Sequence, residues 1–141
     1  MSILDTKQAL IQQLLTVTSS LFDSNDVAYE NANFNPEDKS AWVQPFFIPA
    51  STGMMGKTSG SGDEQRGIFQ VSVFVKLNSG NYDNDQLQIV DDILSAFKYN
   101  TAMVYNNQQV DVLSSTVNTG ASNDAWFKRD ISINYLTFST R

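Results

Sequence analysis

Carboxylates are the main side chains in this sequence that could do chemistry, because its 141 residues include no histidine and no cysteine. Without those two residue types the chain has no thiol nucleophile, no disulfide, no Cys/His zinc site and no histidine general base. Two kinds of arrangement remain as candidates, a run of acidic residues with the spacing of a calcium loop and several paired carboxylates.

The run Asn81-x-Asp83-x-Asp85, with Asp92 at the twelfth position, resembles a calcium-binding loop only loosely. Its sixth position is Gln86 where such a loop requires glycine, and its twelfth position lacks the bidentate glutamate. Helical periodicity also begins inside the run. We therefore interpret the run as an acidic helix N-terminus that complements the helix dipole.

The paired carboxylates do not predict a catalytic site either. In the helical pair Asp91-Asp92 consecutive side chains point about 100° apart and do not converge, and Asp63-Glu64 has the character of solvated surface. A glycosidase-like pair would need partners distant in sequence, such as Glu30 and Asp111, and nothing selects these two. We predict no enzyme and no catalytic, cofactor-binding or metal-binding residues. A small carboxylate-dependent hydrolase or a cation-binding module is the alternative from another functional class.

The charge balance excludes a protein that reads nucleic acids. Nine Lys and Arg residues against fifteen Asp and Glu give a formal net charge of −6, whereas binding to phosphates needs clustered basic side chains. The adjacent basic pair Lys128-Arg129 lies on a predicted strand, where the two side chains point to opposite faces. No apolar run approaches the ~18 residues of a membrane span, so no membrane contact is expected.

Two amphipathic helices are predicted from apolar residues at helical spacing. The first begins near Asp5 as its N-cap and ends near Phe22, and the second runs from Asp83 to Lys98. Their apolar faces comprise Ile3, Leu10, Ile11, Leu14, Leu15, Val17, Leu21 and Phe22 in the first helix and Leu87, Val90, Ile93, Leu94 and Phe97 in the second.

Strands are predicted at 27–31, 41–50, 69–77, 103–105, 110–113 and 127–135. Pro45 and Pro49 cannot donate ladder hydrogen bonds, so their strand should lie at an edge or contain a bulge. Asn106-Asn107 predicts the turn of a hairpin. The order αβββαβββ indicates one α+β domain over residues 1–141, in which the two helices pack on a mixed, mainly antiparallel sheet.

The segment 51–66 separates the second and third strands and holds four of the seven glycines. It is far longer than the about two to five residues of a usual hairpin connection. We predict a flexible loop, either a mobile tip or a binding loop that orders against a partner, since adjacent methionines are adaptable contact residues. Two aromatic side chains beside polar residues also suggest assembly surfaces, with plain core burial as the alternative. The candidate interface residues are therefore Met54, Met55, Lys57, Arg66, Phe74 and Trp126.

Several short motifs, taken together, resemble a known family over nearly the whole chain. Tyr29-Glu30-Asn31 follows the first helix, the motif Arg66-Gly67-Ile68-Phe69-Gln70-Val71 follows the long loop, and Ile131-x-Ile133-x-Tyr135 closes the chain. This layout is similar to the tail terminator proteins of long-tailed bacteriophages, the group of lambda minor tail protein U.

The resemblance implies a structural virion protein with an α/β sandwich fold and no catalytic residues. Such proteins form a hexameric ring that caps the tail tube, ends its polymerisation and provides the surface for joining the head. The expected partners are further copies of the chain in a homohexamer, the tail tube protein and the head–tail connector, with DNA only as passing cargo. The expected location is the neck end of the virion tail, after assembly in the host cytoplasm. The alternative within the virion is a head–tail connector or neck completion protein.

Overall fold

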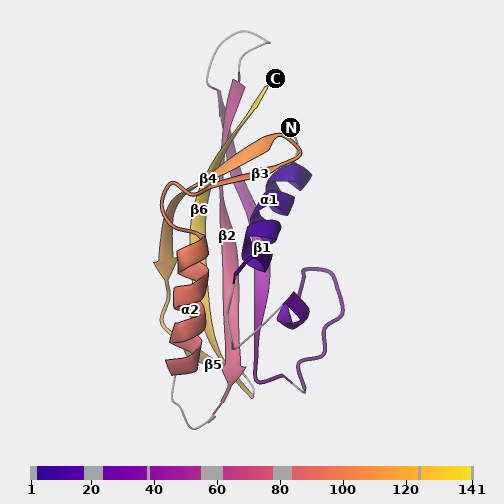
Figure 1. Cartoon of the computed structure of the whole chain (residues 1–141), viewed down its shortest axis with the longest axis vertical. Coiled ribbons are helices and arrows are strands. Elements are labelled where there is room, and N and C mark those ends of the chain that lie inside the picture. The colour runs from indigo at the N-terminus through magenta and orange to yellow at the C-terminus, as the bar shows by residue number, and fades with distance from the viewer. Residues whose placement is uncertain are drawn as a thin grey trace.

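Three long antiparallel strands run the length of the molecule and carry the rest of the fold (Figure 1). They are β1 (Ala41–Met54), β2 (Gly62–Lys76) and β6 (Trp126–Thr140). The computed structural model describes residues 3–17, 24–37, 39–54, 62–77, 84–123 and 125–140. Within these residues the other elements are α1 (Ile3–Leu15), the short 3-10 helix η1 (Ser24–Asp26), α2 (Asn84–Ala96), β3 (Ala102–Tyr105), β4 (Gln108–Val117) and β5 (Ala121–Asn123).

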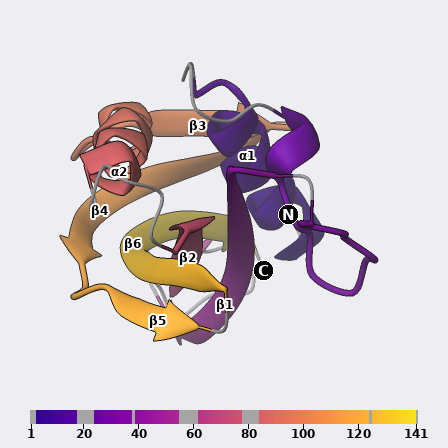
Figure 2. The same cartoon turned by 90° about the horizontal axis from the view of Figure 1, so that it is seen from below.

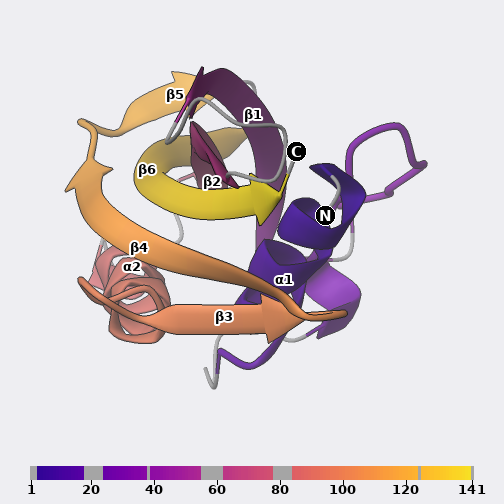
Figure 3. The ribbon, with the colours of Figure 1, turned by 90° about the horizontal axis from the view of Figure 1, so that it is seen from above.

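The strands form one curled sheet in the order β1-β2-β6-β4-β3, and β5 pairs with β6 beside this path. All the pairs between these strands are antiparallel. Figures 2 and 3 look along the long axis and show the sheet curling around the two helices, which occupy its concave side. The predicted α+β class with a mainly antiparallel sheet is confirmed. The predicted order is wrong, because the described elements run αββαββββ.

Two strand predictions account for this difference in order. Residues 27–31 do not form a strand: Val27 makes a single parallel bridge to Val43, and the backbone at Asn31 is left-handed, with a φ of 57° that ends an extended run. The unpredicted strand β5 is short and polar, and pairing with β6 holds it extended. The predicted hairpin between β3 and β4 is confirmed. Its turn residues Asn106 and Asn107 have φ values of 51° and 67°. Both values are positive, as a type I′ hairpin turn requires.

The first helix is shorter than its apolar periodicity predicts. α1 ends at Leu15, where the Thr16 hydroxyl donates a 2.6 Å hydrogen bond to the Gln13 carbonyl oxygen. Such local side-chain bonds compete with helix continuation. Since the helix begins at Ile3, Asp5 lies within the first turn and is not the N-cap. Leu21, Phe22 and Asp83, the first residue of the predicted second helix, lie outside the described residues.

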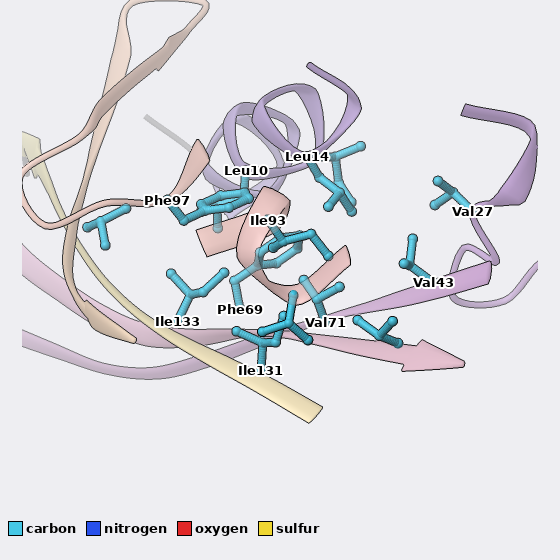
Figure 4. Close-up of a cluster of buried hydrophobic side chains, with 14 of the residues drawn as sticks. Leu10, Leu14, Val27, Val43, Phe69, Val71, Ile93, Phe97, Ile131 and Ile133 are labelled. Atoms are coloured by element: carbon cyan, nitrogen blue, oxygen red, sulfur yellow. The ribbon is translucent and has the colours of Figure 1, made fainter. Parts of the chain in front are cut away.

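The hydrophobic core lies between the helices and the concave face of the sheet (Figure 4). Alternate residues of β2 and β6 point toward the helices, as the period of two in a strand requires. The Phe69 ring of β2 lies 5.8 Å from the ring of Phe97, which follows α2. The fully buried members at this contact are Leu10, Leu14, Val43, Phe69, Val71, Ile93, Phe97, Ile131 and Ile133.

The sheet edge formed by β1 is closed to further strands. Pro45 and Pro49 lie on this edge strand, and a bulge follows Pro49, so both predicted consequences of the two prolines are confirmed. The outward-facing Val43 carbonyl accepts a 2.8 Å bond from the Ala28 amide, and the Phe47 amide donates a 2.7 Å bond to the Glu30 carboxylate. Since residues 43, 45, 47 and 49 alternate outward, this stretch offers few free donors to another strand.

Candidate assembly surfaces

The predicted loop 51–66 is largely strand, which corrects the sequence-based expectation. β1 continues to Met54 and β2 begins at Gly62, with pairs from Ser51↔Arg66 to Met54↔Asp63. β6 pairs with the far side of β2 as far as Gly62↔Thr140. Glycine and serine have a low preference for strands. The strand forms here because β2 is hydrogen-bonded to a neighbouring strand on each side.

We call the three-stranded extension formed by residues 51–54, 62–66 and 136–140 the arm; it lies at the end of the molecule near the C-terminus in Figure 1. Two of the predicted interface residues lie on it, Met54 at the end of β1 and Arg66 on β2. The exposed Arg66 guanidinium forms an ion pair with the Glu64 carboxylate. Met55 and Lys57 lie outside the described residues.

Phe74 and Trp126, the other two predicted interface residues, belong to one aromatic cluster on the convex face. Trp42 stacks on Phe74 with ring centroids 3.9 Å apart, and Trp126 meets Trp42 edge-on at 5.8 Å. The Phe34 ring is tilted against Trp42, with ring centroids 5.1 Å apart. Phe74 is consequently only 4% exposed. Burial, the alternative to an assembly surface, therefore describes Phe74, and its cover comes from Trp42 of the same chain.

Gln86, the sixth residue of the calcium-like run, is a fully buried polar residue. Its Nε2 donates 2.9 Å bonds to the carbonyl oxygens of Val73 and Phe127, and its Oε1 accepts a 3.1 Å bond from Arg129 Nε. Lys128, on the opposite face, lies 3.8 Å from Asp130, so the prediction that the basic pair points to opposite faces is confirmed. Gln86 therefore ties α2 to both β2 and β6.

Gly67, in the middle of the motif from Arg66 to Val71, is packed against an aromatic ring. A Cβ atom at this position would come within 2.6 Å of the Ile48 carbonyl oxygen and would meet the ring and hydroxyl of Tyr135. The Tyr135 ring stacks on Phe47 with centroids 5.7 Å apart. Burial raises the pKa of the Tyr135 hydroxyl to about 12. The missing side chain of Gly67 thus creates the space in which this aromatic pair packs.

The convex face carries exposed apolar residues at the end of the molecule that includes the arm. Val104 is 61% and Phe138 is 47% exposed, and Ile48 is also exposed. A groove of about 370 Å³ opens beside a bulge of β4 between Val112 and Ser114. Its lining is formed by Arg66, Gly67, Ile68, Leu113, Ser114, Asn134 and Tyr135. An antiparallel sheet face that meets water is usually polar, so this surface is suited to a protein contact.

The calcium-like run and the two helices can be compared with what a metal site and a membrane span require. In the described ranges no three acidic side chains come close enough to hold a metal. Asp85 and Asp92 of the calcium-like run lie on α2, whereas Asn81 and Asp83 lie outside the described residues. Neither α1 nor α2 is long and apolar enough to cross a membrane.

A protein-family model described as phage tail terminator protein matches residues 5–135. The chain belongs to the phage tail terminator family. The predicted family is therefore confirmed at the level of tail terminators. Membership gives this protein a structural role in tail assembly, a place in the virion tail and interactions with other tail components.

A solved structure has the same fold as this tail terminator. The two align with a TM-score of 0.74 and 22% sequence identity, over 97% of this chain and 96% of that chain. At this identity the likeness shows the fold alone. No curated protein gives a significant match.

Proposed function

We propose that this tail terminator forms a ring that caps the phage tail tube, ends its polymerisation and presents the surface to which the head is joined. The observation that carries the proposal is the match of the terminator family to residues 5–135. The exposed apolar groups of the convex face support a role that works through protein contacts, since a solitary soluble domain seldom leaves such a surface open.

Within this proposal the arm contacts the tail tube. The arm extends from one end of the sheet, so it can reach a partner along the ring axis while the body of the sheet contacts neighbouring copies (Figure 1). Met54, Met55, Lys57 and Arg66 are the proposed contact residues, because methionines adapt to a partner surface and the basic groups supply charge. The head–tail connector would then contact the opposite end of the ring.

The net charge of −6 suits a conduit for DNA, because an acidic channel repels phosphates and lets the duplex slide. We propose six copies in the ring, assembled in the host cytoplasm before the tail joins the head. Neutralising acidic residues that line the channel should slow DNA ejection, and unchanged ejection would leave the charge with a role in solubility alone.

Sedimentation of the purified protein, alone and with tail tube protein, tests the proposal directly. A ring, or a ring that forms on mixing and stops tube growth, is the expected result. A protein that remains monomeric and never binds or halts tubes would contradict it. Electron microscopy of phage tails made without this protein separates the two roles at the neck. Overlong tubes are expected for a terminator, whereas unattached tails of normal length would identify a connector instead.

A further inference from the structure

The second half of β4 forms an open edge of the sheet. β3 pairs with β4 only as far as Asp111, and Val112 makes the last backbone bonds on that side. Beyond the bulge, residues 114–117 have β6 as their one neighbouring strand in the described part of the chain. All four residues are exposed, and this end of β4 lies on the outside of the molecule in Figures 2 and 3. We call residues 114–117 the β4 edge.

Alternate backbone groups of the β4 edge point away from β6. The Asn118 amide donates a 2.9 Å bond to the Asp130 carbonyl oxygen, which makes these two residues a hydrogen-bonded pair. Since such pairs alternate along an antiparallel ladder, Thr116 is bonded to β6 as well. The amides and carbonyls of Ser115 and Val117 therefore face outward, and no group in the described ranges bonds to them.

Beyond its bulge, the β4 edge lacks the features that usually keep strand edges from pairing. Natural edges are protected by prolines, charged side chains or covering segments. On β1 the outward groups of residues 43–49 are protected by two prolines and by bonds to Ala28 and Glu30. From Leu113 to Asn123, by contrast, the chain has no proline and no charged residue. We therefore expect the β4 edge to be covered in an assembly, and an added strand is the partner that supplies donors and acceptors in alternation.

The outer side of β1 in the arm is a second open edge. β1 ends the sheet on its side, so in the arm it pairs with β2 alone. Even-numbered residues of β2 bond toward β1, as the bond from the Lys76 amide to the Ser40 carbonyl oxygen shows. In the arm their partners are Ser51 and Gly53, so the backbone groups of Thr52 face outward. This part of β1, which we call the arm edge, contains no proline and no charged residue.

Strand direction favours pairing of these two edges between copies. β1, β2, β6 and β4 are adjacent and alternate in direction, so β1 and β4 run in opposite directions. When the β4 edge of one copy lies beside the arm edge of the next copy around a ring, this alternation continues and the new pair is antiparallel. The copies must be staggered, because the arm edge lies nearer the end of the sheet than the β4 edge. Strands inclined to the ring axis, as in closed barrels, provide such a stagger.

We propose that the β4 edge of one copy pairs antiparallel with the arm edge of a second copy, so that the sheets of neighbouring copies join. Because the two edges differ, each copy uses one edge toward each neighbour. Such a heterologous contact repeats from copy to copy and closes into a ring when the rotation permits. The inference rests on the proposed ring function and assigns the edges that build the ring. It leaves residues 55–61 for the contact with the tail tube.

Proline at an outward-facing position tests the contact, because it removes a donor from the edge and spares the bonds to the neighbouring strand. Val117→Pro and Thr52→Pro should each weaken self-association at least about tenfold in sedimentation equilibrium. Urea denaturation establishes that each variant still folds. Neither substitution changes the net charge, so general charge repulsion is the same in every protein compared.

Val104→Pro is the matched control for Val117→Pro. Val104 is also an exposed valine of an edge strand, and its amide faces outward because Thr101 of the same ladder bonds to Val112. The control should change self-association by less than about threefold. Equal losses in Val104→Pro and Val117→Pro would show that proline acts by a general effect on the sheet, and the inference would be wrong.

Hydrogen exchange in the natural protein tests the same contact without a substitution. The amides of Ser115, Val117 and Thr52 should exchange at least about tenfold more slowly in the ring than in the dilute monomer. The Thr116 amide is bonded to β6 in both states and should change little. A change at every second residue is specific to strand pairing. Equal exchange rates of the Val117 amide in the two states would overturn the inference.

Other outcomes would identify other partners of the β4 edge. Normal rings of Val117→Pro that no longer bind tail tube protein would assign the edge to a strand of that protein, and would overturn the inference while leaving the proposed function intact. Protection of Val117 in the ring without protection of Thr52 would indicate a two-fold pairing of β4 edges and would also overturn it. Monomers of the natural protein at all concentrations, with and without tail tube protein, would contradict the proposed function itself.

Discussion

Gly67 is the single residue whose lack of a side chain matters most to the fold. Replacement by alanine would bring the new Cβ within 2.6 Å of the backbone oxygen of Ile48 and against the Tyr135 ring, and backbone cannot move aside easily. Gly67→Ala should therefore lower the free energy of unfolding by about 1–3 kcal/mol, measured by urea denaturation. Gly53→Ala is the matched control, because its nearest neighbour would be 3.8 Å away. Equal losses of stability in the two variants would show that the close approach at Gly67 does not determine the effect of the added side chain.

The buried hydroxyl of Tyr135 predicts a loss of stability at alkaline pH. Its pKa is about 12 in the folded chain and about 10 in the unfolded chain. Between these values the unfolded state releases the proton while the folded state keeps it, so the stability present below pH 10 falls as the pH rises. The two pH units correspond to about 3 kcal/mol at most. Tyr135→Phe should lose this part of the pH dependence, and unfolding curves from pH 8 to 12 with the same slope for both proteins would contradict the assignment.

At the scale of elements, the docking of α2 on the sheet depends on Gln86. Replacement by leucine would remove the side-chain donor from the carbonyl oxygens of Val73 and Phe127, and the Oε1 acceptor from Arg129 Nε. Gln86→Leu should cost about 1–3 kcal/mol of stability and increase amide hydrogen exchange in α2. Gln88→Leu changes an exposed residue two positions away and should have a small effect. Protection of α2 that is unchanged in Gln86→Leu would show that apolar packing alone holds the helix.

Elements that depend on local periodicity or turn chemistry were predictable from the sequence, while those that depend on a distant partner were not. The hairpin turn at Asn106-Asn107 and the edge position of the strand with Pro45 and Pro49 follow from backbone properties of the residues themselves. The strand character of 62–66 comes from pairing with β6, about seventy residues later, which no local pattern reports. The cover of Phe74 by Trp42 depends in the same way on the register between β1 and β2.

At the scale of the whole molecule, the paired strands of the arm are needed for folding, whereas the segment that connects them is proposed to bind the tube. Deleting residues 53–64, the natural choice for a flexible loop, would remove paired residues of β1 and β2. Replacing only 55–61 by Asn-Gly leaves three residues, including Gly62, between the paired Met54 and Asp63, which is a common hairpin length. This variant should keep its stability within about 1 kcal/mol and still form rings, but bind tail tube protein weakly in co-sedimentation.

A second variant distinguishes loop length from loop chemistry in the same experiment. Replacing 55–61 by seven Gly and Ser residues keeps the length but removes Met55 and Lys57, the proposed contact residues. Loss of tube binding in both variants would assign the contact to these side chains. Loss in the shortened variant alone would show that the length of the segment matters and not these side chains. Tube binding that is unchanged in both would place the tube contact elsewhere on the ring. Because β1 and β2 pair with each other on both sides of the bulge and β2 pairs with β6, neither replacement should alter the surfaces through which the copies assemble.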